Sequence, residues 1–225
     1  MKRLTRMLDV VYGVGLLVLM SPFMALIALL ILVCEGRPVF YVSERMKTPE
    51  TGFRLYKFRT MRVDNTPLRA TGGDQNGRIT PTGRWLRRHR LDELPQLFNV
   101  LRGDMSFVGP RPPLRRYTEM FPDLYAAVLK DRPGITGLAS LVYHAHEARI
   151  LADCETGQET ELTYCRRCIP VKAKLDLLYA RHRTPLSDLR LMLATVFPVI
   201  SMHRTNRALF KRTFLNVKRT VSPRL

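Results

Sequence analysis

The longest apolar run of the chain lies near its N-terminal end. No charged side chain occurs between Val10 and Val33, and a helix of about 20 apolar residues is long enough to cross a bilayer. Ser21 and Pro22 interrupt the run. Because proline removes a backbone donor and pushes against the preceding turn, we expect the helix to bend there, with a nearby serine hydroxyl bonded to the freed carbonyl.

Basic residues flank this run on both sides. They are Lys2, Arg3 and Arg6 before it, and Arg37, Arg45 and Lys47 after it. The positive-inside rule therefore favours neither orientation of a spanning helix, and the strongly basic remainder of the chain is expected on the cytoplasmic side. We predict a re-entrant segment over residues 1–36 that enters the membrane, bends and leaves on the same side. A simple spanning helix and a helix buried in a larger core are the alternatives.

Short strands are predicted after the apolar run. Residues 38–42 are rich in β-formers, and residues 53–59 largely alternate between apolar and basic side chains, with the period of a half-buried strand. Residues 64–79 are polar and rich in glycine, which is typical of a loop.

Helical patterns follow the strands. Residues 80–83 offer a start for a basic helix over 84–90, because proline is tolerated in the first turn. Apolar side chains within 94–101 fall at i, i+3, i+4 and i+7, the spacing of one helical face, and we expect Asp92 to cap this helix and Gly103 to end it. Further helices are predicted over 117–130, 175–183 and 185–200, with a turn over 132–137 and no assignment for 138–168.

The charge of the chain indicates an anionic partner. There are 37 Lys and Arg residues against 19 Asp and Glu, a formal net charge of +18. Nucleic acid, anionic lipid and a phosphorylated substrate all fit such a charge. Aromatic residues make up only 8% of the chain and do not alternate with basic ones, which argues against a surface that stacks single-stranded nucleic acid.

The C-terminal residues 201–225 combine basic side chains with Phe210, Phe214 and Leu215 and contain no acidic residue. A segment that lies on an anionic membrane surface explains both features. A disordered basic tail is the alternative.

Three of the four cysteines lie close together in the sequence. Cys154, Cys165 and Cys168 have the spacing Cys-x10-Cys-x2-Cys, and His144 and His146 precede them. Thiolate and imidazole are the usual ligands of a structural zinc site, but a single CxxC motif is weak evidence. Three reduced thiols in a cytosolic loop are the favoured interpretation.

The stretch 91–112 contains the clearest candidates for catalytic residues. Asp92 and Glu93 are adjacent carboxylates at the start of an apolar helix, and Arg111 follows in a turn between two prolines. By itself, such a pair is ordinary negative charge at a helix N-terminus. Beside fixed cations, it also suits the handling of a phosphate ester with a divalent metal.

These residues belong to a longer series of motifs. In order, the motifs are RMLD at 6–9, SP at 21–22, GRPVF at 36–40, YKFRTM at 56–61, LDELPQLFNV at 91–100, DMSFVGPRP at 104–112, RPGITG at 132–137 and LDLLY at 175–179. With them, the chain resembles the bacterial sugar transferases that are monotopic phosphoglycosyl transferases, which initiate glycan assembly on polyprenol phosphate. One departure stands at 141–147, where the family commonly has an Asn-Gly-Arg stretch and this chain has no arginine.

The resemblance implies a reaction in two steps. Asp92 attacks the β-phosphate of a UDP-sugar and expels UMP, and polyprenol (undecaprenyl) phosphate then attacks the phosphosugar held on Asp92. The implied cofactor is Mg²⁺, with Glu93 as its ligand and Asp176 as a further candidate. The candidate substrate- or phosphate-binding residues are Arg111, Arg87, Lys57, Arg59 and Arg132.

The resemblance also assigns roles in the membrane hairpin. Ser21 and Pro22 make the bend, Arg6 meets headgroups or polyprenol phosphate, and Asp9 pairs with Arg6 across one helical turn. Arg88 and Arg90, like Arg59, fit a solvated surface or one that faces headgroups.

The predicted fold class is α+β and mostly helical, in three parts: a re-entrant (helix-break-helix) hairpin over 1–36, a cytosolic catalytic domain with a small β element and interfacial amphipathic helices over 37–200, and a basic tail over 201–225. The implied location is the bacterial cytoplasmic membrane, monotopic, with the catalytic domain on the cytoplasmic face. The implied partners are a UDP-sugar, polyprenol phosphate and an anionic bilayer, without nucleic acid. The product would serve an exopolysaccharide, a capsule, an O-antigen or a glycoprotein glycan.

Two other functions compete with this prediction. A membrane-anchored protein that binds nucleic acid explains the positive charge but leaves Asp92 and Glu93 unexplained, and no motif for such binding is evident. A non-catalytic scaffold is disfavoured because Asp92, Glu93 and Arg111 are all present.

Overall fold

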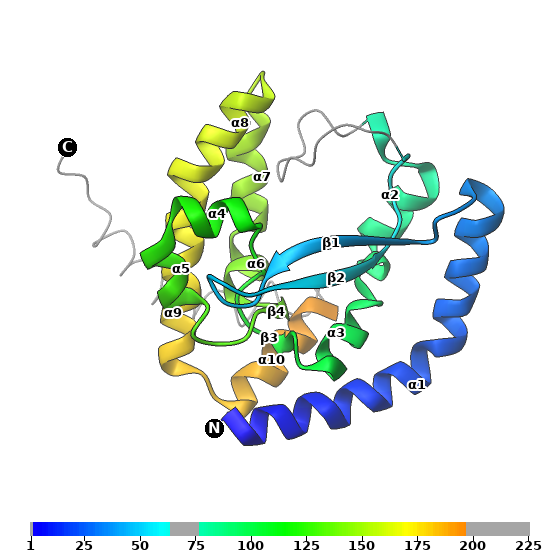
Figure 1. The fold of residues 1–225 in the computed structure, drawn as a ribbon, viewed down its shortest axis with the longest axis horizontal. Helices are drawn as coiled ribbons and strands as arrows, with labels where there is room; N and C mark the ends of the chain where they lie inside the picture. The colour runs from blue at the N-terminus through cyan, green and yellow to red at the C-terminus, as the bar shows by residue number, and fades with distance from the viewer. Residues whose placement is uncertain (1, 64–76, 197–225) are drawn as a thin grey trace.

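The computed structural model describes residues 2–63 and 77–196, and these residues are mostly helical. In this part of the chain the strands form only two small two-stranded sheets. Figure 1 shows the long N-terminal helix α1 (Lys2–Glu35) along one edge of the molecule, with the other elements gathered on its inner side. The predicted fold class, mostly helical with a small β element, is confirmed; the residues 64–76 and the predicted tail at 201–225 lie outside the described residues.

Helix α1 is apolar and long enough to cross a membrane over Leu4–Glu35. It contains Pro22, yet the helix continues through this residue, and Figure 1 shows that its axis changes direction near the middle. The Ser21 hydroxyl donates to the Val18 carbonyl at 2.9 Å, which is the carbonyl that loses its donor to proline. The bend and its serine contact agree with the prediction, although a bend within one helix replaces the predicted break between two.

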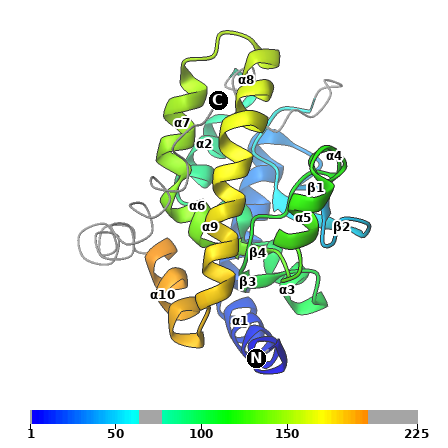
Figure 2. The same cartoon turned by 90° about the vertical axis from the view of Figure 1, so that its left-hand side faces the viewer.

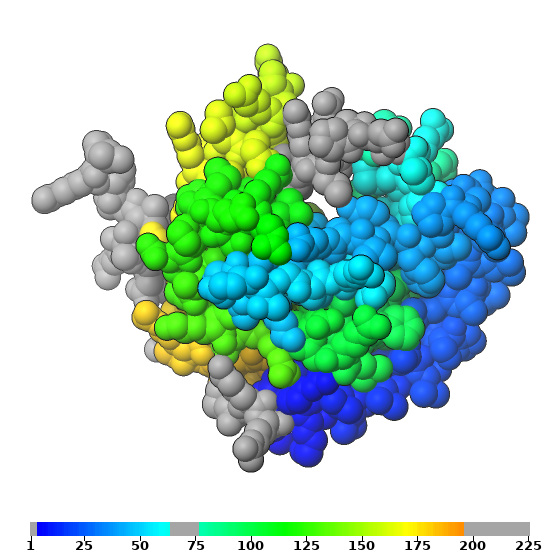
Figure 3. Space-filling model, viewed as in Figure 1, coloured from blue at the N-terminus to red at the C-terminus, as the bar shows by residue number. Residues whose placement is uncertain are grey.

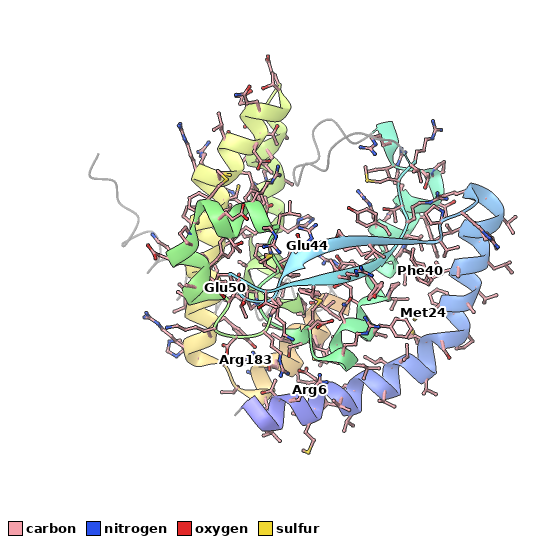
Figure 4. The ribbon with its side chains drawn as sticks, viewed as in Figure 1. Arg6, Met24, Phe40, Glu44, Glu50 and Arg183 are labelled. Carbon is pink, nitrogen blue, oxygen red and sulfur yellow. The ribbon has the colours of Figure 1, made fainter. Side chains whose placement is uncertain are left out.

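The first turns of α1 are tied to the domain beside it. Arg6 donates to the carbonyls of Val100 and Leu101 at 2.5 and 2.7 Å (Figure 4). Asp9 accepts from the Ser106 hydroxyl at 2.7 Å and the Phe107 amide at 3.2 Å. The predicted pairing of Arg6 with Asp9 is therefore replaced by two hydrogen bonds between each side chain and the domain.

Helix α3 (Gln96–Arg102) packs along this part of α1. Arg6 binds carbonyls of its last turn, which have no partner within the helix. Gly13 permits the close approach, because a Cβ there would lie 2.8 Å from Leu101 Cδ2. As predicted, α3 ends at Gly103, whose φ of +84° suits glycine.

A β-hairpin follows α1. Strands β1 (Phe40–Met46) and β2 (Gly52–Phe58) pair antiparallel, from Phe40 opposite Phe58 to Met46 opposite Gly52. The two predicted strands are confirmed, although β1 begins two residues later and ends four residues later than the predicted 38–42. Figure 3 shows the hairpin on the face toward the viewer, between α1 and the helices of residues 115–128.

Helix α2 (Pro81–Arg88) begins as predicted, since the Thr80 side chain accepts from the amide of Gly83. The prediction that Asp92 caps α3 is wrong. Arg90 adopts a left-handed conformation with φ +55°, so the next residues form a separate 3-10 turn, η2 (Leu91–Glu93), before α3 starts behind Pro95. Asp92 is thereby freed from a capping role.

The second half of the chain differs more from the prediction. The single helix expected over 117–130 is two helices, α4 (Arg115–Met120) and α5 (Pro122–Val128), because proline starts a new helix after Phe121. The expected turn at 132–137 contains a strand, β4 (Gly134–Thr136), which pairs parallel with β3 (Ser106–Val108).

The remaining elements are helices that close the molecule opposite the hairpin (Figure 2). They are α6 (Leu138–Val142), α7 (His144–Ala152), α8 (Gly157–Thr163), a π-helical turn η3 (Tyr164–Cys168), α9 (Ile169–His182) and α10 (Pro185–Val196). The helices predicted at 175–183 and 185–200 correspond to α9 and α10, although residues 197–200 lie outside the described residues.

One hydrophobic core joins helix α3, which follows the acidic pair, to its neighbours. It packs Leu97 and Val100 of α3 against Leu55 of β2 and Phe107 of β3, and Leu17 of α1 lies against it. Helix α3, which follows Glu93, is therefore fixed by both the hairpin and helix α1.

Candidate active site

The two adjacent carboxylates line a cleft of about 1150 Å³. One wall is formed by the β1–β2 hairpin and by α2 with η2, and the facing wall by α4 to α7, η3 and α9. Such a volume is large enough for a nucleotide-sized ligand.

Glu93 is surrounded by cations. Its Oε1 accepts from Lys57 Nζ at 2.7 Å and from Arg111 Nη2 at 3.3 Å, and its Oε2 lies 3.9 Å from Arg90 Nη1. Burial alone would raise the pKa of this carboxyl, but Arg111 and Lys57 together lower it to about 2. Glu93 is therefore ionised at any physiological pH.

Asp92 has a different environment. Its side chain is buried, and no other described residue forms a hydrogen bond or an ion pair with its carboxylate. Burial raises its pKa, although Lys57, Arg87 and Arg111 oppose this shift. Of two neighbouring carboxylates, one is thus held by fixed cations and the other is left available at the cleft.

Three of the predicted phosphate-binding residues gather around this pair. Lys57 comes from β2, and Arg111 follows β3 in the turn between two prolines. Arg87 lies on α2, where its Nε donates to the Thr60 hydroxyl at 2.8 Å. All three line the cleft with Asp92 and Glu93.

The other two predicted phosphate-binding residues are placed differently. Arg59 also lines the cleft, but it is buried and its guanidinium donates to the carbonyls of Glu35, Gly36 and Arg37 at 2.8, 2.9 and 3.1 Å, at the end of α1. Arg132 is exposed and is absent from the residues that line the cleft.

Asp176, the predicted additional metal ligand, lies on the facing wall of the cleft. Burial raises its pKa to about 7, although a hydrogen bond from the Ala139 amide opposes the shift. The structure brings Asp176 into the same cleft as Asp92 and Glu93, in a hydrogen bond with α6 rather than with either carboxylate.

This carboxyl predicts a pH-dependent stability. The folded protein binds a proton at Asp176 that the unfolded chain, with its ordinary value of 3.8, has released between about pH 4 and 7. Stability therefore falls as the pH rises through this range. Asp176→Asn removes this contribution and stabilises the protein at pH 8 by on the order of a few kcal/mol. Thermal unfolding of both proteins at pH 5 and pH 8 tests this: an equal gain at both pH values would contradict it.

A metal site built from protein ligands alone is absent from the described residues, since no group of three or more His, Cys, Asp or Glu side chains converges there. In this part of the chain Cys154, Cys165 and Cys168 are free thiols, and burial raises the pKa of Cys165 and Cys168. Burial therefore disfavours the thiolate form of Cys165 and Cys168, which is the form that binds metal.

Several residues of the cleft escaped the sequence analysis. Lys172 of α9 pairs with Glu147 of α7 at 2.9 Å and contacts the Tyr164 hydroxyl at 3.3 Å, on the wall that faces Arg111. Glu147 and Tyr164 lie in the segment 138–168 that received no assignment, and Lys172 precedes the helix predicted at 175–183, so no pattern linked the three residues. Arg45 also lines the cleft, and its alternation with Tyr41 and Ser43 along β1 was a usable signal.

Comparison with known proteins agrees with the motifs. A sequence model of the family described as bacterial sugar transferase matches residues 1–202. An undecaprenyl-phosphate glucose phosphotransferase of Komagataeibacter xylinus is 34% identical over 203 residues, which cover 85% of this chain and 35% of that protein. The UDP-glucose:undecaprenyl-phosphate glucose-1-phosphate transferase of Escherichia coli (strain K12) is 36% identical over 167 residues, covering 72% of this chain and 36% of that protein. The exopolysaccharide production protein ExoY of Rhizobium meliloti is 38% identical over 149 residues, covering 59% and 66%.

The matches thus span about a third of the length of the first two relatives and about two thirds of the third. The family match includes the acidic pair, its surrounding cations and helix α1. The family predicted from the motifs is confirmed: this chain belongs to the bacterial sugar transferases.

Proposed function

We propose that the protein transfers a sugar-1-phosphate from a UDP-sugar to undecaprenyl phosphate and releases UMP. The observation that carries this proposal is the contrast between two neighbouring carboxylates. Asp92 lines the cleft without a partner among the described residues, whereas Glu93 is held by Lys57 and Arg111. The names of the relatives, which are undecaprenyl-phosphate sugar phosphotransferases, support the same reaction.

In the first step, a carboxylate oxygen of Asp92 attacks the β-phosphorus of the donor. A bond forms between this oxygen and phosphorus, and the bond from phosphorus to the bridging oxygen breaks, so that UMP leaves with the electron pair. The raised pKa of Asp92 favours this role, because a more basic carboxylate is a better nucleophile once ionised. Lys57 and Arg111 offset the negative charge of the diphosphate that must approach it.

In the second step, a phosphate oxygen of undecaprenyl phosphate attacks the same phosphorus. The acyl phosphate bond to Asp92 breaks, which restores the carboxylate and gives a lipid-linked diphosphosugar. An acyl phosphate is reactive enough for this transfer, since a carboxylate is a good leaving group. The sugar-1-phosphate therefore passes from a soluble nucleotide to a lipid phosphate through the side chain of Asp92.

The residues present fit a Mg²⁺ ion that is shared with the substrate. Lys57 and Arg111 occupy Oε1 of Glu93, and Oε2 has only the longer contact with Arg90. One or two carboxylates with substrate phosphates are the usual surroundings of Mg²⁺. When bound, the ion would neutralise charge on the diphosphate and stabilise the leaving phosphate. Glu93 is the proposed ligand, with Asp176 as a further candidate from the facing wall.

We further propose that α1 is re-entrant, with the catalytic domain on the cytoplasmic face. Its beginning is bound to the domain through Arg6 and Asp9, and its end through Arg59. A straight helix of 34 residues would be about 50 Å long and would carry one end away from the domain. Contacts of both ends with one domain support an entry and an exit on the same side.

Cysteine labelling tests this topology. Leu4 is exposed at the beginning of α1, and Cys34 is exposed at its end. Two proteins are compared: a Leu4→Cys variant that lacks Cys34, and the wild type, in which Cys34 is the only cysteine of α1. In inside-out membrane vesicles, a membrane-impermeant maleimide should modify α1 in both proteins. In intact spheroplasts it should modify neither. Modification of the Leu4→Cys variant in spheroplasts would show an outside N-terminus and contradict the proposal.

UMP release tests the proposed reaction. Purified protein in bilayer nanodiscs is given Mg²⁺, undecaprenyl phosphate and, in turn, UDP-glucose, UDP-galactose, UDP-N-acetylglucosamine and UDP-N-acetylgalactosamine. We expect UMP and a lipid-linked product with at least one donor, which would also identify the sugar. Salt-dependent binding of duplex DNA without UMP release from any donor would favour the nucleic-acid-binding alternative.

A further inference from the structure

One face of strand β1 carries polar atoms that lack partners. Tyr41, Ser43 and Arg45 alternate along the strand and therefore share a face. The Tyr41 hydroxyl, the Ser43 hydroxyl and Arg45 Nε are all buried, and none has a hydrogen-bond partner among the described residues. Buried polar atoms are nearly always hydrogen-bonded, and Tyr41 and Arg45 also line the cleft, so their unpartnered atoms indicate a place for a ligand.

The charge of Arg45 is also uncompensated. Among the described residues no carboxylate pairs with it, and its guanidinium lies near that of Arg111, which together with burial lowers the pKa of Arg45. Lys57 and Arg111 both contact Glu93. Arg45 thus lies beside a cation whose carboxylate partner does not pair with Arg45, and a buried unpaired charge is costly unless an anion joins it.

These three cations line one small cavity. Arg45, Lys57 and Arg111 line a small cavity of about 10 Å³ at the wall of the cleft, together with the buried amide side chain of Gln96. This is about the space that one oxygen atom with its hydrogens needs. The donors on its wall suit an oxyanion, since guanidinium and ammonium groups offer hydrogens and a positive charge together.

We propose that Arg45 is a phosphoryl-binding residue that completes, with Lys57 and Arg111, a three-cation site at the cleft. The identity of the phosphate that this site binds rests on the proposed function. The two sources are the diphosphate of the UDP-sugar, represented by UMP, and the phosphate of the lipid acceptor. A guanidinium can donate two parallel hydrogen bonds to a phosphate, and here it is held on a strand rather than on a loop.

The test compares the wild type with Arg45→Met, Arg45→Lys and Arg54→Met, each as the full chain in nanodiscs. Arg54 is an exposed arginine on the neighbouring strand and is the matched control. Without ligand, Arg45→Met should unfold at the same temperature as the wild type or higher, because it removes an unpaired buried charge. It should bind UMP about 10- to 100-fold more weakly, and Arg45→Lys should recover part of the affinity. Arg54→Met should behave as the wild type.

A second arm measures binding of undecaprenyl phosphate in the nanodisc. Weaker UMP binding in Arg45→Met assigns the site to the donor, and weaker lipid binding alone assigns it to the acceptor. Unchanged affinity for both ligands would overturn the proposal, whatever the thermal stability of the variant. A lower unfolding temperature with unchanged affinities would instead show a structural role for Arg45.

Failure of this inference can be separated from failure of the proposed function. If UMP binds in an Arg45-dependent way but no UDP-sugar yields UMP, the anion site stands and the reaction is wrong. If the wild type turns over and Arg45→Met has an unchanged KM for both substrates, the reaction stands and the role of Arg45 is wrong.

Discussion

Asp92→Asn is expected to abolish sugar-1-phosphate transfer, by about 10⁴-fold or more, because an amide cannot form the covalent phosphosugar. The same substitution should leave the unfolding free energy unchanged or raise it. Burial raises the pKa of Asp92, so the fold disfavours its charged form, and a neutral side chain of the same shape relieves this cost. Initial rates of UMP release and thermal unfolding, measured on the same preparation, test both parts.

This combination separates a chemical role from a structural one. A variant that loses activity because it misfolds would also lose stability, whereas Asp92→Asn should not. An Asp92→Asn strain that makes its glycan in normal amount would contradict the proposed nucleophile and would revive the scaffold alternative.

Glu93→Gln should have the opposite effect on stability. The carboxylate of Glu93 neutralises Lys57 and Arg111 in a buried setting, so its loss leaves two cations without their partner. We expect the unfolding free energy to fall by roughly 3–5 kcal/mol near neutral pH and the rate of UMP release to fall by about 10²-fold or more. The folded pKa of about 2 lies below the ordinary 4.5, so this stabilisation is complete above about pH 4.5 and is lost as the pH falls toward 2.

Glu44→Gln is the matched control. Glu44 also forms an ion pair with an arginine, Arg115 at 2.7 Å, but both side chains are exposed to solvent. Removal of an exposed pair changes stability very little. Equal unfolding temperatures for Glu93→Gln and the wild type would show that the surrounding cations do not depend on this carboxylate.

Most of the local structure near the acidic pair could be predicted from the sequence. Thr80 begins α2 and Gly103 ends α3 as predicted, because capping depends on the residues at the helix ends. The bend in α1 and its serine contact were also predicted, since the effect of Pro22 is local. Lys57, Arg87 and Arg111, which the family motifs made candidates, line the same cleft as the acidic pair.

The features that could not be predicted from the sequence depend on contacts between residues that are distant along the chain. Arg59 lies in a family motif and lines the cleft, but its contacts with carbonyls at the end of α1, 22 to 24 residues away, were not predicted. Asp92 has the residue type of a helix cap but not that position, because the left-handed conformation of Arg90 separates η2 from α3. The Lys172–Glu147 pair spans 25 residues of a region without a clear pattern.

The proposed covalent phosphosugar on Asp92 is tested most directly by mass spectrometry of the protein. The protein in nanodiscs is mixed with Mg²⁺ and the UDP-sugar that yields UMP, acceptor is withheld, and the reaction is quenched and digested. We predict that the peptide with Asp92 gains the mass of the sugar phosphate, that fragmentation places it on Asp92 rather than Glu93, and that undecaprenyl phosphate removes it. An adduct on another residue, or a fully active protein that never forms one, would contradict the mechanism.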